Sequence, residues 1–133
     1  MAQVETVQQI YQEFGRGDIP AILSHLAEDV EWEYGNNSTD VPWLQPRRGR
    51  THVAEFFQAL ADFEVRRFEP KTFLESGNVV VALIDVEATV RSTGRSIVED
   101  DEVHVWYFER SGKVSRFRHR VDTHQQWQAW RPT

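Results

Sequence analysis

The chain has 133 residues, no cysteine and a formal net charge of −6 at pH 7. The absence of cysteine excludes disulfides, thiol catalysis and cysteine-based zinc sites. The acidic balance argues against nucleic acid as a partner, and no apolar run approaches the ~20 residues of a membrane span, so we expect no membrane partner. We therefore expect a single domain over residues 1–133, located in the cytoplasm and without a signal peptide.

The first half of the chain has mainly helical periodicity. Apolar residues recur at helical spacing in residues 4–18 (VETVQQIYQEFGRGD), and a second helix is predicted over 18–29 (DIPAILSHLAED). Residues 30–34 (VEWEY) alternate as a strand, and residues 35–49 have the Gly, Pro and Asn content of a long loop. A third helix is predicted over residues 51–63 (THVAEFFQALADF), because its apolar side chains fall on one face.

After residue 63 the apolar period changes from helical spacing to two. Four strands separated by short turns are predicted, and a short helix follows at the C-terminus. Helices first and an antiparallel meander afterwards indicate an α+β fold, with the helices packed on one face of a curved sheet. The predicted strands are residues 66–76, 78–90, 96–109 and 113–122, and the predicted C-terminal helix is residues 125–130.

Residues 115–123 (SRFRHRVDT) alternate between two kinds of side chain. In a strand, Arg116, Arg118 and Arg120 share one face, and His119 lies on the opposite, apolar face. An arginine face with apolar and aromatic neighbours has the composition of a protein–protein interface, and an exposed lattice of salt bridges is the alternative.

The turn at residues 110–113 (RSGK) fixes how the last two strands pair. A Ser-Gly turn, or a four-residue loop, gives a register in which paired residue numbers add to 223. His104 then faces His119, and Glu102 lies on the same face, diagonal to His119. The sequence therefore predicts a pair of histidines beside a carboxylate on the inner face of the sheet.

Three stretches resemble a known superfamily: residues 17–33 (GDIPAILSHLAEDVEWE), 48–60 (RGRTHVAEFFQAL) and 112–127 (GKVSRFRHRVDTHQQW). They are similar to the cone-shaped proteins related to nuclear transport factor 2 and ketosteroid isomerase, and most of all to SnoaL-like polyketide cyclases. The resemblance implies a cone-shaped, curved antiparallel sheet with three N-terminal helices on its concave face. It also implies no metal, no cofactor and a homodimer formed through the outer sheet face.

The resemblance also suggests positions for catalytic groups. The histidine of the cyclases falls at His104, and their acid–base aspartate falls at His119, where this chain has an imidazole instead. The catalytic base of the isomerases would fall near Tyr34, their helix-one tyrosine near Ile10, and their proton-donating acid near His104.

We predict that His119 is the catalytic base, that His104 is its partner or an electrophilic donor, and that Tyr34 stabilises an oxyanion. A packed, hydrogen-bonded histidine pair is the alternative, and the pair with Glu102 also has the ligand types of a zinc or iron site. Trp43, which looks exposed on the long loop, could cover the pocket or merely pack against its neighbours. The predicted substrate-binding residues are Trp32, Phe56, Trp106, Phe117, Trp43 and Glu102.

These residues favour one kind of activity. They suggest cofactor-independent acid–base chemistry, of isomerase or cyclase type, on a small and largely apolar carbonyl compound in an interior pocket. The alternatives are a non-catalytic module that binds a small apolar molecule in the same pocket, and a dimeric assembly domain.

Overall fold

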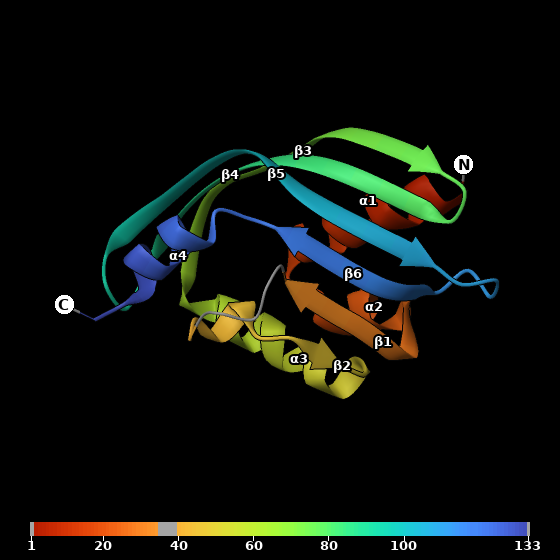
Figure 1. The fold of residues 1–133 in the computed structure, drawn as a ribbon, viewed down its shortest axis with the longest axis horizontal. Coiled ribbons are helices and arrows are strands. Elements are labelled where there is room, and N and C mark those ends of the chain that lie inside the picture. Colours follow the sequence, from red (N-terminus) through yellow and green to blue (C-terminus); the bar gives the residue numbers. More distant parts are fainter. Residues whose placement is uncertain (1, 35–39, 133) are drawn as a thin grey trace.

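The computed structural model describes residues 2–34 and 40–132, without the side chains of Glu33 and Tyr34. Four α-helices, two short 3₁₀ helices and six strands make up the described fold (Figure 1). In chain order they are α1 (Ala2–Arg16), α2 (Ile19–Ser24), β1 (Leu26–Tyr34), η1 (Pro42–Leu44), β2 (Arg47–Arg48), α3 (Arg50–Ala59), η2 (Leu60–Asp62), β3 (Phe63–Ser76), β4 (Val79–Val90), β5 (Arg95–Phe108), β6 (Val114–Arg120) and α4 (Thr123–Trp130).

One curved sheet contains all six strands, in the order β2-β1-β6-β5-β4-β3. The strands β3 to β6 form the predicted antiparallel meander, and β1 extends it by pairing parallel with β6. The paired residues of β5 and β6 add to 223 from Val103–Arg120 to Tyr107–Arg116, so the predicted register is confirmed.

The three N-terminal helices cover the concave side of this sheet (Figure 1). Helix α1 contacts β3 and β4, and α2 and α3 both contact β1. Buried residues of α1 and α3, such as Val7, Ile10 and Val53, join the inner side chains of the strands in one apolar core. The predicted α+β cone is therefore confirmed. Among the described residues no helix is both long and apolar enough to cross a membrane.

The second helix ends earlier than its sequence predicts. Helix α2 stops at Ser24, and β1 begins at Leu26, where a helix was expected to continue to residue 29. The cause is tertiary pairing, because the carbonyl of His25 accepts the N–H of Val114 at 2.9 Å and Leu26 pairs with Val114 in β6. Hydrogen bonds to a neighbouring strand here override a local helical pattern.

A β-bulge in β5 directs the side chains that follow it. Asp100 and Asp101 together oppose Asp85 of β4, since Glu99 pairs with Val86 and Glu102 with Ile84. Asp101 has a φ of 59°, in the left-handed region that an extra residue in a bulge often adopts. The extra residue reverses the alternation, and for this reason Ile97 and Glu102 both face the interior although they are five positions apart.

The arginine face of β6 lies on the outside of the sheet, as predicted. Arg116 donates to Glu31 of β1 at 2.9 Å, and the guanidinium groups of Arg116 and Arg118 lie 5.8 and 5.9 Å from the ring centre of Tyr107. A homodimer through this face stays a prediction.

Candidate functional site

A cavity lies between the concave face of the sheet and the helices, and its wall is almost entirely apolar and aromatic. The volume of the cavity that the centre of a water-sized sphere can occupy is about 90 Å³. This is enough room for several waters or one small ligand. All eight predicted site residues whose side chains the structure describes lie around this cavity: Trp32, Trp43, Phe56, Glu102, His104, Trp106, Phe117 and His119. Their functional roles stay predictions.

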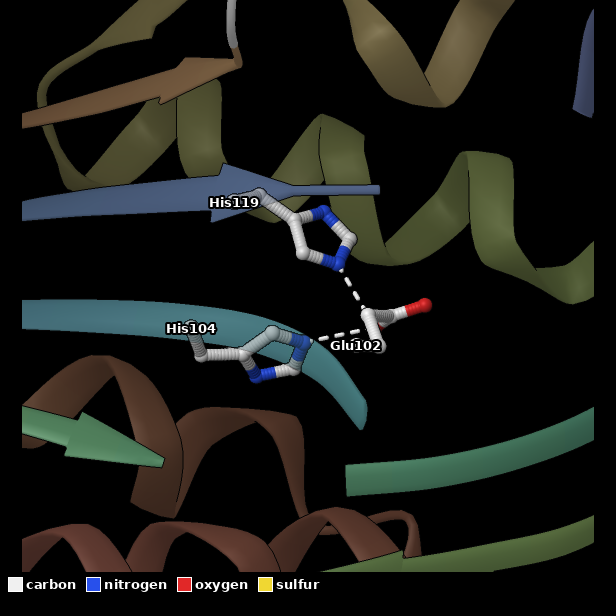
Figure 2. Close-up of side chains that lie close together, drawn as sticks. All are labelled: Glu102, His104 and His119. Carbon is white, nitrogen blue, oxygen red and sulfur yellow. Dashed lines mark hydrogen bonds and ion pairs between the residues drawn. The ribbon is translucent and has the colours of Figure 1, made fainter. Parts of the chain in front are cut away.

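A single carboxylate oxygen joins the two histidines (Figure 2). Glu102 Oε2 lies 2.6 Å from His104 Nε2 and 2.8 Å from His119 Nε2. The three side chains come from β5 and β6 and are each less than a tenth exposed. The second oxygen of Glu102 points away from both rings. A carboxylate only accepts hydrogen bonds, so both Nε2 atoms carry a proton and donate it to Glu102.

Two further side chains continue this set of hydrogen bonds on the other side of His104. Tyr11 of α1 places its hydroxyl 2.7 Å from His104 Nδ1, and Trp106 Nε1 donates to the same hydroxyl at 3.0 Å. Because Nε2 of His104 already carries the proton, Nδ1 accepts from the Tyr11 hydroxyl, which in turn accepts from the indole. The chain of donors therefore runs from Trp106 through Tyr11 and His104 to Glu102.

The protonation states of these hydrogen-bonded side chains follow from burial and charge. Burial alone raises the pKa of Glu102, but the positive charge that His119 carries when it is protonated and the hydrogen bonds from both imidazoles lower it well below its usual range. Burial lowers the pKa of His104 from 6.5 to about 4, and the positive charge that His119 carries when it is protonated acts in the same direction. Burial also raises the pKa of Tyr11 well above 10. At neutral pH, Glu102 is therefore ionised, His104 is neutral and Tyr11 keeps its proton.

The two histidines consequently differ in what they can do. Both ring nitrogens of His104 are used, one by Tyr11 and the other by Glu102, so this residue holds the carboxylate in place. His119 uses Nε2 for Glu102, and in that tautomer its Nδ1 carries the lone pair that can take a proton. An imidazole held by a carboxylate is an arrangement suited to general acid–base catalysis, because the carboxylate stabilises the imidazolium.

The same three groups could hold a metal ion, since their ligand atoms all lie within 4.8 Å of one another. Ligand atoms around a tetrahedral zinc are separated by about 3.3 Å, given metal–ligand distances of about 2.0–2.1 Å. Glu102 Oε2 lies 2.6 and 2.8 Å from the two Nε2 atoms, so these side chains have the spacing of hydrogen bonds and would have to move apart to bind an ion.

The predicted oxyanion donor, Tyr34, lies at the end of β1. Its backbone pairs with His119 of β6, while its side chain lies outside the described residues. Its role therefore stays a prediction.

Trp43 is buried, although its sequence context predicted an exposed side chain. It lies in η1, is only 2% exposed, and packs edge-on against Phe63 with ring centres 4.5 Å apart. Its indole N–H donates to Gln126 Oε1 of α4 at 2.8 Å. The expectation of an exposed loop aromatic is wrong, because η1 turns the ring inward and α4 supplies a partner for the N–H.

Two polar residues of the cavity, Tyr11 and Gln126, were not predicted from the sequence as site residues. Tyr11 was counted only as part of an apolar helix face, and the resemblance placed the helix-one tyrosine near Ile10, whereas Tyr11 itself reaches His104. Gln126 was part of a helix without an assigned face. Both residues could have been identified from the sequence, because each carries a hydroxyl or amide at a position that helical spacing places toward the core.

The fold and this interior cluster define a class, the NTF2-like cone with polar groups inside its cavity. The family model of the SnoaL-like domain matches residues 7–117, and the chain therefore belongs to the SnoaL-like family. None of the curated proteins matches the chain.

Several solved structures are similar over nearly the whole chain. An NTF2-like protein of unknown function from Burkholderia pseudomallei is 30% identical, with a TM-score of 0.85 over 97% of both chains. An NTF2-like protein from Burkholderia xenovorans is 27% identical, with a TM-score of 0.85 over 98% of this chain and 96% of that one. TerC, co-crystallised with polyporic acid, is 26% identical, with a TM-score of 0.82 over 97% of this chain and 98% of that one.

Proposed function

We propose that this protein binds a small, largely apolar carbonyl compound in its cavity and transfers a proton at the carbon next to the carbonyl. His119 acts as the base. The observation that carries the proposal is the hydrogen bond of 2.8 Å between His119 Nε2 and Glu102, at the wall of an aromatic cavity. That bond fixes the tautomer and leaves the basic lone pair on Nδ1.

The proton transfer needs no external reagent. The C–H bond breaks as Nδ1 of His119 takes the proton, and the electron pair moves into an enolate whose negative charge lies mainly on the carbonyl oxygen. The imidazolium that forms is stabilised by ionised Glu102, and it returns the proton to the same or a neighbouring carbon. Tyr34 is the proposed donor to the enolate oxygen, because its backbone pairs with His119.

Hydrogen bonds from neighbouring inner side chains keep Glu102 in position for this role. His104 donates to the oxygen that also faces His119, and Tyr11 fixes the tautomer of His104. We assign positioning roles to His104 and Tyr11, since their polar atoms are used within the protein. With a pKa of about 4, His104 is also a weak base at neutral pH.

The comparisons support the binding half of the proposal. TerC, a relative of similar fold along its whole length, has been co-crystallised with polyporic acid. The cavity of the present chain has the aromatic walls that an apolar ligand requires, formed by side chains such as Trp32, Trp106 and Phe117. Polyporic acid is therefore the first ligand to test for binding.

Proton transfer can be tested without knowing the natural substrate. 2-Tetralone is an apolar bicyclic ketone with exchangeable protons on both carbons beside its carbonyl. We expect the protein to accelerate their exchange in D₂O, followed by ¹H NMR, above the rate in buffer. His119→Gln keeps a donor toward Glu102 and should lower the exchange rate by about 10²–10⁴, the usual contribution of a general base. His124→Gln, a histidine exposed on α4, is the matched control and should exchange normally.

Binding is measured separately by quenching of tryptophan fluorescence, because Trp32, Trp43 and Trp106 line the cavity. If His119→Gln binds 2-tetralone and polyporic acid as the unchanged protein does but loses exchange, His119 is the base. Exchange at the buffer rate in both proteins, with binding retained, would establish the non-catalytic binding module instead, and equal acceleration in both would show that His119 is not the base. Absence of binding by both probes would overturn the proposal.

A further inference from the structure

Gln126 is a buried amide at the cavity wall that has no role in the proposed proton transfer. It lies in α4, is 4% exposed, and lines the cavity. Asp122 caps this helix, accepting the N–H of Gln125 at 3.0 Å through its side chain and that of Gln126 at 3.1 Å through its carbonyl. The cap fixes the first turn of α4, so the position of Gln126 is defined by the backbone.

The orientation of the Gln126 amide follows from its partner. Trp43 Nε1 lies 2.8 Å from the side-chain oxygen, and an indole N–H can only donate. The oxygen of the amide must therefore face Trp43, and the nitrogen with its two protons faces away from it. Trp43 is itself held by its edge-on contact with Phe63, so the amide cannot easily turn.

Among the described residues, the side chain of Gln126 makes its hydrogen bond through the oxygen, and its amide nitrogen donates to no protein atom although the residue is only 4% exposed. A buried N–H without an acceptor is costly, and folded proteins satisfy nearly all of them with protein, water or ligand atoms. Because Gln126 lines the cavity, the cavity contents are where an acceptor can come from.

This donor comes from a different element of the fold than the histidines. Helix α4 lies beside the start of β5, where Gln125 Oε1 accepts the N–H of Val98 at 2.8 Å. His104 lies six residues further along β5, and the residues of this strand that line the cavity are Ile97, Glu102, His104 and Trp106. The cavity wall therefore has a polar group from α4 as well as those from β5 and β6.

We propose that Gln126 forms a second polar subsite, which donates a hydrogen bond to an acceptor oxygen on the far end of the ligand. This inference rests on the proposed function, and it specifies the ligand class further. The ligand is an elongated, largely aromatic compound with two oxygen-bearing ends. One end presents its carbonyl and acidic C–H to His119, and the other presents a carbonyl oxygen to Gln126.

A matched pair of probes tests this subsite. 2-Tetralone has one oxygen, and 6-acetyl-2-tetralone adds a second carbonyl at the opposite end of the same ring system. We expect the unchanged protein to bind the acetyl compound several-fold more tightly than 2-tetralone, measured by tryptophan fluorescence. The ratio of the two dissociation constants is the readout, because a general loss of stability weakens both probes alike.

Two substitutions separate binding from a purely structural role. Gln126→Glu keeps an oxygen acceptor for Trp43 but removes both N–H donors when ionised, and Gln126→Met keeps the size without polar atoms. Both should reduce the ratio to about one or below. Thermal melting checks that each variant folds. Trp43→Phe offers a further test, because it releases the amide from its fixed orientation and should also lower the ratio.

The outcomes distinguish the two proposals. If both probes bind and exchange but the ratio is the same in all variants, Gln126 only satisfies the indole of Trp43, and the subsite is disproved. A ratio near one in the unchanged protein disproves it as well. If neither probe binds, the proposed function fails, together with the subsite that rests on it.

Discussion

Two polar clusters lie on opposite faces of the same region of the sheet. The inner chain consists of Trp106, Tyr11, His104, Glu102 and His119, and the outer cluster consists of Arg67, Lys71, Asp85 and Asp101. Both contain short ionic or hydrogen-bonded contacts, and both meet at the bulge of β5, which carries Asp101 on its outer side and is followed directly by Glu102.

The clusters differ in how much water reaches them. In the outer cluster, Lys71 bridges Asp85 at 2.8 Å and Asp101 at 2.7 Å; Asp85 is buried, with its side chain 11% exposed, but the lysine is 35% and Asp101 61% exposed. The side chains of Glu102, His104 and His119 are at most 10% exposed. Water and salt screen the outer charges, whereas each inner group depends on its protein partners. Similar contacts should therefore have very different consequences when one partner is removed.

The largest effect is expected for Glu102→Gln. One amide cannot replace a charged acceptor shared by two N–H groups, and its own NH₂ would face one of the imidazoles. Removal of one member of a buried ionic pair costs about 3–5 kcal/mol, so we expect a loss of about 3 kcal/mol in the free energy of unfolding, measured in urea. Exchange of 2-tetralone should fall as well.

Glu87→Gln is the control for this prediction. It makes the same chemical change on the outer face of β4, where Glu87 is 38% exposed and lies 3.6 Å from Arg67. Its effect on unfolding should be much smaller. Equal losses in the two variants would contradict the contrast between the inner and outer faces.

The next largest effect concerns pH. His104 has a pKa near 6.5 in the unfolded chain and about 4 in the folded protein, so between these values the unfolded state binds the extra proton. Stability should therefore fall as the pH falls from about 6.5 to about 4, by on the order of 3 kcal/mol, since each pH unit corresponds to about 1.4 kcal/mol. The depressed pKa of Glu102 acts in the same direction at the acidic end.

The contribution of a second group, Glu99, must be removed before the pH dependence of stability that is due to His104 can be measured. Burial raises the pKa of Glu99 from 4.5 to about 7, which makes its contribution to stability decrease as the pH rises through that range. Urea unfolding of Glu99→Gln as a function of pH isolates the contribution of His104. Adding His52→Gln, which changes an exposed histidine of α3, should leave the slope unchanged. A flat profile between pH 4 and 6.5 would show that His104 is not held neutral by burial.

Tyr11→Phe comes third. The change removes the donor to His104 Nδ1 and the acceptor for Trp106 Nε1, leaving two buried groups without partners. We expect a loss of about 1–2 kcal/mol in the free energy of unfolding. Tyr107→Phe, on the outer face of β5, is the matched control and should change stability less. If the two variants behave alike, the Tyr11 hydroxyl does not support the inner chain.

The sequence predicted the inner histidines because their placement depends on local features. A short turn sets the register of β5 and β6, and alternation decides which side chains face inward. The pairing of His104 with His119, and the side on which Arg116 and Arg118 lie, follow from these two features alone.

The remaining parts of the site depend on contacts that local patterns do not encode. Tyr11 reaches His104 from a helix 93 residues away in the sequence, and Trp43 meets Gln126 across 83 residues. The end of α2 was misplaced because β6 captures the backbone after it. The bulge at Asp101, where the residue is not glycine but has a positive φ, also escaped detection, since Lys71 and Asp85 stabilise it from two other strands.

The smallest effect is expected for Lys71→Met, which breaks the ion pairs of Lys71 with Asp85 and Asp101 at once and leaves Arg67 paired with Asp85. The hydrogen bond from the Asp101 N–H to Asp85 Oδ1, at 3.1 Å, remains and still holds the bulge. Exposed pairs contribute little and are screened by salt, so the loss of stability should be smaller than that of Tyr11→Phe and should shrink further at high salt. The measurement is urea unfolding at low and high ionic strength. A large, salt-independent loss, accompanied by slower exchange of 2-tetralone, would mean that the bulge needs Lys71 to hold Glu102 in place, and the two faces would then act as one unit.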